Sequence, residues 1–392
     1  MSNLGLVLSG GGARAAYQAG VLVAIGDICS EMKIPNPFQY YTGVSAGAIN
    51  SCVLATHPGS FIDGTKQLQT LWTQIESNQV YLNDVVSLTK ISWQWLSELS
   101  LGGMKRTPGK ALLNTSPLRD LISKHCTFEN IQKKIDAGIL KAVGVSALDF
   151  HTSSTVTFIQ GTQEVPLWQR VRRQGLRADI HIDHVMASAA IPILFPAVAV
   201  DNRYYGDGSI RNYSPCGPAI YMGADRLLAI GVRRQQDVCS ITHTTLPSDP
   251  PSAARVASVL LNALMSDGIE FDMERIEHIN IGLAKLQQTE RSALTMRPIE
   301  ALWISPSKDF SKIATTKSKE LPLMIRYLMR GLGDIHESGE MMSFLMFERS
   351  YCEHLMELGF DDGMAAKQRI QNLLYPESER DEPFYPPLLD VP

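Results

Sequence analysis

The stretch LGLVLSGGGARAAYQAG (residues 4–20) joins a short apolar run to three glycines and then to a segment with apolar residues at helical spacing. The apolar run 4–9 predicts a buried strand, and residues 13–32 predict a helix. The order of strand then helix repeats next in the sequence. FQYYTGV (38–44) predicts a second strand and AGAINSCVLATH (46–57) predicts a second helix. A strand–helix–strand–helix opening predicts an α/β fold with a parallel sheet and right-handed crossovers.

The pattern beyond this opening is less regular but still alternates between helix and strand. Residues 58–115 suggest a helical insertion or cap near the sheet edge, with glycines, aromatics and basic residues mixed together. Residues 139–150 and 154–161 predict a pair of strands. Residues 181–200 predict a short helix, a proline-containing turn and a strand, and residues 225–234 predict another buried strand that ends in arginines.

The segment TTLPSDPPS (244–252) has three prolines and no periodicity, and we interpret it as a linker. After it the chain becomes Met-rich and helix-patterned, although EALWISP (300–306) is consistent with one last strand. The sequence therefore predicts three regions, namely an α/β core at 1–245, a helical region at 253–373 that packs on the core, and a proline-rich tail at 374–392.

Composition excludes several classes of function. The net charge is −4, from 36 basic and 40 acidic residues, so no global positive field would recruit nucleic acid. The six cysteines show no metal-ligand spacing and no disulfide framework, so we expect reduced thiols, no metal site and no cofactor. The N-terminus lacks a basic region before its short apolar run, and no window approaches ~18 apolar residues. We therefore expect a cytoplasmic protein without a signal peptide or a transmembrane segment.

Ser45 lies in Gly43-Val44-Ser45-Ala46-Gly47, which fits G-x-S-x-G between a predicted strand and a predicted helix. In that context a serine occupies a sharp turn with its hydroxyl exposed, and small neighbours allow strand and helix to approach closely. The helix N-terminus favours a developing alkoxide. The alternative is structural, because serine is also a common N-cap residue.

The glycine turn at residues 10–12 lies between a predicted strand and helix, where free amides bind anions. Such a turn beside Ser45 would form an oxyanion hole. A competing interpretation is a degenerate dinucleotide fingerprint, Gly10-x-Gly12-x-x-Ala15. That fingerprint requires an acidic residue about 20 positions on, at the end of the second strand, and this sequence has none there.

A serine nucleophile requires a base within hydrogen-bond reach. The order Ser45, Asp207, His243 matches an α/β-hydrolase triad, but only one crossover separates the two glycine turns here, and His243 lies in the predicted linker. Asp207 lies between two glycines, on a turn that presents its carboxylate. An Asx-type turn without a catalytic role is the alternative for Asp207.

Taken together, these motifs resemble those of the patatin-like phospholipases, a family of lipid acyl hydrolases. The matching segments are GGGAR (10–14), GVSAG (43–47), SAAIPILFP (188–196) and DGS (207–209), and their order and spacing agree from about residue 4 to 234. Ser209 is a departure, because the family usually has glycine or alanine there. A serine is small enough to keep the turn, but it could shift Asp207 or hydrogen-bond to it.

The resemblance implies a three-layer α/β/α fold with a mainly parallel sheet, to which this chain adds a helical C-terminal extension. It also implies a phospholipase A or lysophospholipase type of activity through a Ser45–Asp207 dyad and an acyl-serine intermediate. Gly10, Gly11, Gly12 and Arg14 would form the oxyanion hole, and Gly43, Gly47 and Gly208 would support the turns.

The implied partners are a lipid or phospholipid substrate and a membrane surface contacted transiently, with the protein peripheral at membranes. An acyltransferase or thioesterase would use the same dyad, whereas a non-catalytic dinucleotide-binding module would need neither residue. The basic segments 104–110 and 169–177 would meet head-group phosphates or form solvated faces. The Met-rich segments 321–332 and 340–348 would dock on membranes or, as methionine favours, fill helix–helix cores.

Overall fold

The computed structural model describes a large part of the chain. The described residues are 3–82, 111–235, 256, 259–260, 268–287, 289, 293–323, 325–326 and 339–375. The predicted linker at 244–252, His243, the basic segment 104–110 and residues 376–392 of the predicted tail lie outside them.

A central sheet organises the fold, with strand order β10-β9-β1-β2-β3-β4-β6-β5 and with β8 and β7 attached to β3. The strands are β1 Leu4–Leu8, β2 Tyr40–Val44, β3 Ala142–Asp149, β4 Ser154–Gly161, β5 Gln169–Arg170, β6 Arg173–Arg177, β7 Val198–Val200, β8 Arg203–Asp207, β9 Arg226–Ile230 and β10 Glu300–Ile304. Neighbouring strands from β10 to β3 are parallel, whereas β4 and β8 both run antiparallel to β3. The predicted α/β class with a mainly parallel sheet is confirmed.

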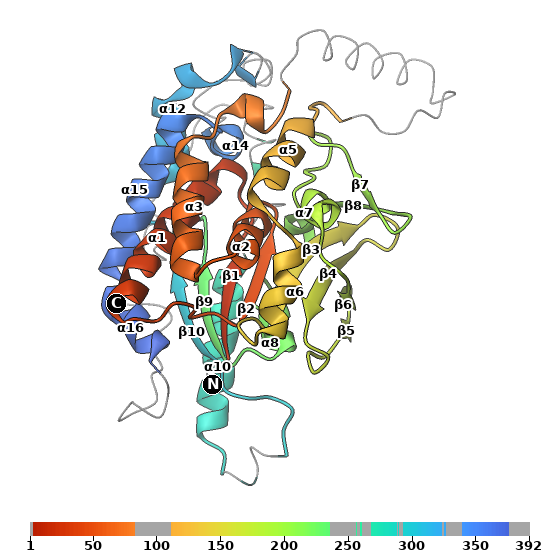
Figure 1. The fold of residues 1–392 in the computed structure, drawn as a ribbon, viewed down its shortest axis with the longest axis vertical. Helices are drawn as coiled ribbons and strands as arrows, with labels where there is room; N and C mark the ends of the chain where they lie inside the picture. The colour runs from red at the N-terminus through yellow and green to blue at the C-terminus, as the bar shows by residue number, and fades with distance from the viewer. Residues whose placement is uncertain are drawn as a thin grey trace, which may run out of the picture.

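Helices cover both faces of the sheet (Figure 1). They are α1 Ala15–Glu31, α2 Ala46–Thr56, α3 Phe61–Thr73, α5 Ser116–His125, α6 Glu129–Asp136, α7 Ile182–Ser188, α8 Gly217–Met222, α10 Ile269–Ala284, α12 Phe310–Thr316, α14 Gly339–Leu345, α15 Arg349–Ala365 and α16 Lys367–Leu374. Short 3-10 turns lie at η1 Gly12–Arg14, η2 Ser77–Gln79, η3 Gly208–Arg211 and η5 Ser318–Glu320.

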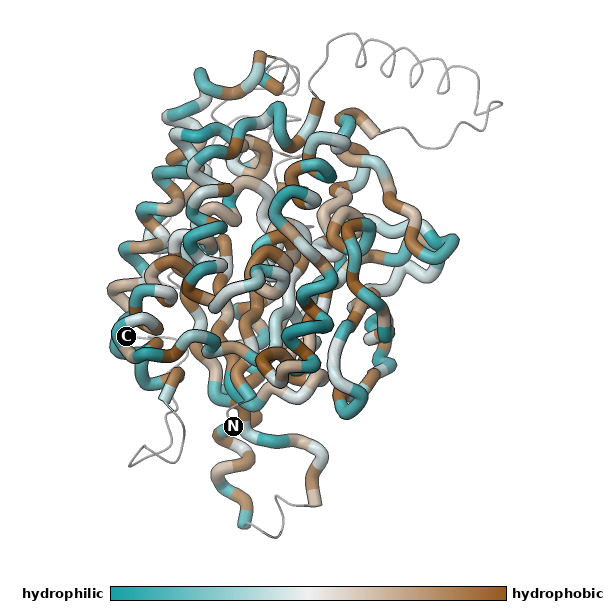
Figure 2. Tube along the Cα trace, in the orientation of Figure 1, coloured by the Kyte–Doolittle hydropathy of each residue, from teal (hydrophilic) through white to brown (hydrophobic). Residues whose placement is uncertain are grey.

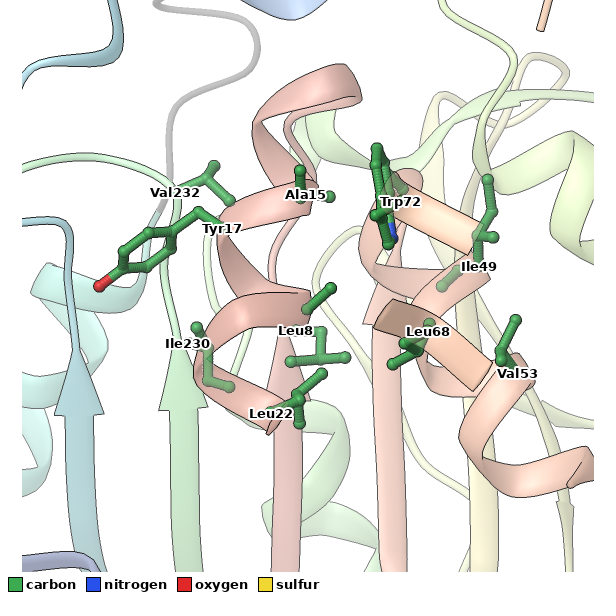
Figure 3. Close-up of a cluster of buried hydrophobic side chains, with 14 of the residues drawn as sticks. Leu8, Ala15, Tyr17, Leu22, Ile49, Val53, Leu68, Trp72, Ile230 and Val232 are labelled. Atoms are coloured by element: carbon green, nitrogen blue, oxygen red, sulfur yellow. The ribbon is translucent and has the colours of Figure 1, made fainter. Parts of the chain in front are cut away.

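The alternation of side chains along the strands produces the layers. Leu4, Leu6 and Leu8 of β1 point to one face, where they join a core cluster with α1, α2, α3 and α15. Val7 points to the other face and joins a second cluster with α8 and α10. Figure 3 shows Leu8, Leu22 and Ile230 within the first cluster, at the contact between helix and sheet.

The C-terminal region shares the sheet and the core with the N-terminal region. The expected last strand is confirmed as β10, which pairs in parallel with β9. α15 packs closely on α1, since a Cβ atom on Gly20 would lie 2.0 Å from the Met356 carbonyl oxygen. The predicted division near residue 245 lies outside the described residues and stays a prediction.

Two further expectations are decided by burial. In the Met-rich segment 340–348, Met341, Met342 and Met346 are all buried, so this segment fills the core rather than facing a membrane. The five cysteines in the described ranges are free and buried, as expected, namely Cys29, Cys52, Cys126, Cys216 and Cys352. No helix in the described part of the chain is long and apolar enough to cross a bilayer.

Candidate active site

Ser45 occupies the turn between β2 and α2, with φ 55° and ψ −129°. A positive φ is unfavourable for a residue with a Cβ atom, and such strain concentrates at functional turns. Ser45 is at the N-cap position, but its hydroxyl makes no capping hydrogen bond. Instead it donates to the Asp207 carboxylate. The purely structural interpretation of this serine as a helix cap is therefore wrong.

The two glycines beside Ser45 allow the turn to approach its surroundings closely. A Cβ atom on Gly43 would lie 2.4 Å from the Gly47 carbonyl oxygen. A Cβ atom on Gly47 would lie 2.4 Å from the carbonyl oxygens of both Leu8 and Ser9. Because contacts this short are sterically forbidden, only glycine brings the Ser45 turn against the end of β1.

Asp207 ends β8 and is fully buried. Ser45 Oγ donates to Asp207 Oδ2 over 2.6 Å, and the Ser209 amide donates to Asp207 Oδ1 over 2.8 Å. One carboxylate oxygen thus forms the Asx-type turn, while the other faces Ser45. Asp207 can therefore be a turn residue and the partner of the serine at the same time. Burial raises the pKa of Asp207, and the hydrogen bonds with Ser45 and Ser209 lower it. Burial is the larger effect, so the pKa is raised to about 6.

Ser209 lies between the aspartate turn and the glycine turn. A Cβ atom on Gly10 would lie 2.1 Å from Ser209 Oγ and 3.0 Å from Ser45 Cβ. The glycine at position 10 therefore makes room for both serines. The Ser209 hydroxyl helps to lower the pKa of Asp207, yet within the described residues it makes no hydrogen bond of ordinary geometry. Ser209 does not displace the aspartate, since Asp207 still bonds to Ser45.

The glycine turn after β1 contacts the C-terminal region as well as the dyad. Gly12 has φ 55°, and a Cβ atom on it would lie 2.2 Å from the Phe344 carbonyl oxygen of α14. A Cβ atom on Gly11 would lie 2.6 Å from Val232. The turn is thus packed from two sides, with Gly10 facing Ser45.

Arg14 directs its guanidinium into α14. It is 4% exposed, and its Nε donates to Ser343 Oγ over 2.8 Å. One terminal nitrogen donates to Glu340 Oε2 over 2.5 Å, and the guanidinium carbon lies 4.0 Å from the centre of the Phe344 ring. Glu340 and Ser343 were not predicted from the sequence, since they lie more than 300 residues from Arg14 and only folding brings them together.

Ser188 supports the elbow from a third direction. Its Oγ accepts a hydrogen bond from the Ser45 amide over 2.8 Å and donates to the Ser146 carbonyl oxygen over 2.6 Å. Gly208 packs against the same carbonyl, because a Cβ atom there would lie 2.3 Å away. The sequence marked Ser188 as part of a motif, but nothing in it indicated that its hydroxyl fixes the nucleophile's backbone.

The structure therefore brings together most of the residues that the sequence singled out. Ser45, Asp207, Gly10 and Gly208 meet at one end of the sheet, and Gly43 and Gly47 shape the elbow. Arg14 lies beside them but faces α14.

Residues 6–220 match the family model for patatin-like phospholipases. The chain belongs to the patatin-like phospholipase family. Membership of this family implies a lipid ester hydrolase that acts on a lipid substrate. The matched range contains both Ser45 and Asp207, together with both glycine turns, whereas α14 lies outside it.

Several solved structures resemble this patatin-like chain. VipD from Legionella pneumophila has a TM-score of 0.32 and 11% identity, and the match covers 88% of this chain and 67% of that chain. Human GIVD cytosolic phospholipase A2 has a TM-score of 0.42 and 10% identity, and the match covers 95% of this chain and 60% of that chain. A chain of the heterodimeric ExoU–SpcU complex from Pseudomonas aeruginosa has a TM-score of 0.29 and 15% identity, and the match covers 94% of this chain and 76% of that chain. No curated protein matches the sequence.

Proposed function

We propose that this patatin-like protein hydrolyses fatty-acyl esters of phospholipids or lysophospholipids through a Ser45–Asp207 dyad. The observation that carries the proposal is the 2.6 Å hydrogen bond from Ser45 Oγ to a fully buried carboxylate. A nucleophile and its base must lie within such a distance for the proton to move.

In the first half of the reaction, Ser45 Oγ attacks the ester carbonyl carbon and gives its proton to Asp207. The carbonyl electron pair moves onto oxygen, and amides of the Gly10–Gly12 turn stabilise that charge. When the tetrahedral intermediate collapses, the alcohol leaves with the proton from Asp207. Ser45 then carries the acyl group.

In the second half, Asp207 takes a proton from water as the water attacks the acyl-serine. Collapse of this second intermediate returns the proton to Ser45 Oγ and releases the fatty acid. The burial that raises the pKa of Asp207 to about 6 makes it a stronger base than an exposed aspartate while leaving it ionised at neutral pH.

Labelling with a fluorophosphonate probe tests the nucleophile. The wild-type chain is expected to label and Ser45→Ala to remain unlabelled, because only the hydroxyl oxygen at position 45 attacks phosphorus. Equal labelling of the two forms would contradict the proposal. Replacing His243 by alanine tests the alternative of a Ser45–Asp207–His243 triad. A rate loss as large as that of Asp207→Asn would contradict the dyad and favour the triad.

A mass-spectrometric assay on a panel of phospholipids, lysophospholipids, acylglycerols and acyl thioesters tests the substrate class. We expect free fatty acid from the phospholipid or lysophospholipid members. Acyl transfer to an added alcohol in place of water would indicate an acyltransferase, and preferential cleavage of thioesters would indicate a thioesterase. The protein would act from the aqueous side, as a peripheral protein at the membrane surface.

A further inference from the structure

Exposed apolar side chains occur among arginines on the turns at the active-site end of the sheet. Val171 is 88% exposed in the turn between β5 and β6, where arginines flank it on both sides. Tyr204 of β8 is 62% exposed, and Phe150, directly after β3, is 44% exposed. We call the surface formed by Phe150, Arg170, Val171, Arg172, Arg203 and Tyr204 the basic aromatic surface.

Backbone hydrogen bonds connect the parts of this surface. The Phe150 amide donates to the Tyr204 carbonyl oxygen over 3.1 Å, which joins the end of β3 to β8. The Thr155 amide donates to the Arg172 carbonyl oxygen over 2.9 Å, which joins the start of β4 to the β5–β6 turn. Because β3 and β4 form one antiparallel pair in which Asp149 lies opposite Ser154, these contacts lie at the same end of the sheet.

Charge on this surface is predominantly positive. Arg170, Arg172 and Arg203 are exposed, and the acidic residues close to them or to Phe150 in the sequence are Asp201 and Asp149. The guanidinium carbon of Arg170 also lies 5.6 Å from the centre of the Tyr221 ring of α8. Asp149 is fully buried and is held by Arg203 at 3.4 Å. Figure 2 shows that the turn between β7 and β8, which carries Asp201, is hydrophilic.

The basic aromatic surface is close to the candidate dyad. β8 begins in the surface with Arg203 and Tyr204 and ends at Asp207. Four residue steps along a strand span about 13 Å. A membrane in contact with this surface would therefore lie close to the dyad. A short segment of an acyl chain would span the distance between them.

We propose that the basic aromatic surface docks the protein on bilayers that contain anionic phospholipids. The arginines would meet lipid phosphates, while Val171, Phe150 and Tyr204 would enter the head-group boundary, where apolar and aromatic side chains are stable. This inference rests on the proposed function, since it places a lipid surface next to Ser45.

Vesicle sedimentation with the full-length Ser45→Ala variant tests the docking without lipid hydrolysis. We expect binding to phosphatidylcholine vesicles that contain phosphatidylserine and little binding to phosphatidylcholine alone. Arg170→Glu with Arg172→Glu should lower the partition coefficient at least about tenfold. The control is Lys66→Glu with Lys133→Glu, which changes the net charge equally on α3 and α6, away from the surface.

Equal losses in the two double variants would overturn the proposal in favour of an effect of net charge alone. Unchanged binding of the arginine variant, or equal binding to both kinds of vesicle, would also overturn it. Failure of Ser45 to react with a fluorophosphonate would remove the proposed function but leave the vesicle result standing, so the two failures are distinguishable.

Contacts between α14 and the glycine turn carry a second and independent inference. α14 lies outside the part of the chain that matches the family, yet Glu340, Ser343 and Phe344 hold Arg14, and the Phe344 carbonyl packs on Gly12. Both the side chain and the backbone of the turn are therefore fixed by the C-terminal region.

We infer that α14 positions the Gly10–Gly12 turn for oxyanion binding, with Glu340 and Ser343 as positioning residues. Oxyanion donors are effective only when they are already oriented before the charge forms. A turn released from α14 would retain its amides but lose their orientation. This inference also rests on the proposed function.

Steady-state kinetics of the Glu340→Gln, Ser343→Ala double variant tests this role. We expect kcat to fall at least about tenfold with KM changed less than about twofold, because the loss affects the transition state. The affinity for an alkyl trifluoromethyl ketone, which forms a tetrahedral adduct, should fall in parallel. The control is Glu353→Gln, which removes the exposed Arg349–Glu353 pair of α15 without touching the turn.

A double variant with a lower melting temperature but unchanged kcat and ketone affinity would show a merely structural role and overturn the inference. Fluorophosphonate labelling of wild-type Ser45 separates this outcome from failure of the proposed function. If Ser45 labels and kcat of the double variant is unchanged, only the role of α14 is lost.

Discussion

Two buried aspartates in this molecule have nearly the same local contacts. Asp207 accepts hydrogen bonds from the Ser45 hydroxyl and the Ser209 amide. Asp272 accepts hydrogen bonds from the Ser214 hydroxyl and the Cys216 amide, each over 2.9 Å. Burial raises the pKa of both carboxyl groups.

Their surroundings differ in ways that separate a candidate base from a structural carboxylate. Asp272 has a cation beside it, Arg275 at 3.3 Å, and its amide partner directly precedes α8. Asp207 has no ion pair with a residue in the described ranges, and its serine lies on a strained turn next to Gly10. A raised pKa therefore does not by itself separate a candidate base from a structural carboxylate, because both aspartates have one and only their surroundings differ.

The largest expected difference between the two aspartates is in catalysis. Asp207→Asn should lower kcat by about 10²–10⁴, because the amide accepts no proton from Ser45. Asp272→Asn should leave kcat within a factor of about three. The measurement is the kcat of ester hydrolysis by the two purified variants. Similar losses of kcat in both would contradict the assignment of different roles to Asp207 and Asp272.

The same pair should differ in stability. The folded-state pKa of Asp207, about 6, is above its unfolded value near 3.8, so folding becomes less favourable as pH rises from about 4 to above 6. Asp207→Asn should therefore raise the free energy of unfolding by about 1–3 kcal/mol at pH 8 and much less at pH 4.

Asp272→Asn should stabilise the protein less than Asp207→Asn does, because the variant loses the attraction of Arg275. Denaturant unfolding at both pH values measures the two effects. An equal gain in both variants at pH 8 would show that Arg275 does not compensate the burial of Asp272.

Backbone strain distinguishes the two serines. Ser45 has a positive φ, and Ser214 is not among the described residues with positive φ. Ser45→Gly should be more stable than Ser45→Ala by about 1 kcal/mol, because glycine relieves the strained conformation. Ser214→Gly should show no such gain over Ser214→Ala. Thermal unfolding of the four variants tests this, and a gain at both positions would argue against strain at Ser45.

The smallest effect concerns Ser209. Its hydroxyl lowers the pKa of Asp207, so Ser209→Ala should move the acidic limb of the kcat/KM profile to higher pH by less than about one unit. In the wild type this limb should lie near pH 6, with activity lost below it as Asp207 is protonated. Ser214→Ala, the matched change at the other aspartate, should leave the limb unmoved.

The sequence predicted those parts of the site that depend on local turns. The glycines around Ser45 and at positions 10–12 mark strand-to-helix turns by themselves, and two glycines frame Asp207. Parallel strands then bring the first two turns to one end of the sheet. The C-terminal region was harder to assign, because only its apolar patterns were visible.

The remaining parts of the site depend on contacts between distant segments. Ser188 bonds to the Ser45 amide across 143 positions, and Arg14 meets Ser343 across 329. No local pattern encodes such partners. The methionines of α14 favoured a helix–helix core but left a membrane-facing surface open as the alternative. Only the folded chain shows which of these uses they have.

The pairing of β10 with β9 has a consequence for the synthesis of this protein. Until residues 300–304 leave the ribosome, β9 presents an open apolar edge for the several seconds needed to translate the intervening 70 or so residues. We expect ribosome-bound chains arrested before residue 290 to be protease-sensitive around β9 and chains arrested well beyond residue 345 to be protected. Equal protection in the two would show that the first strands fold without their C-terminal neighbour.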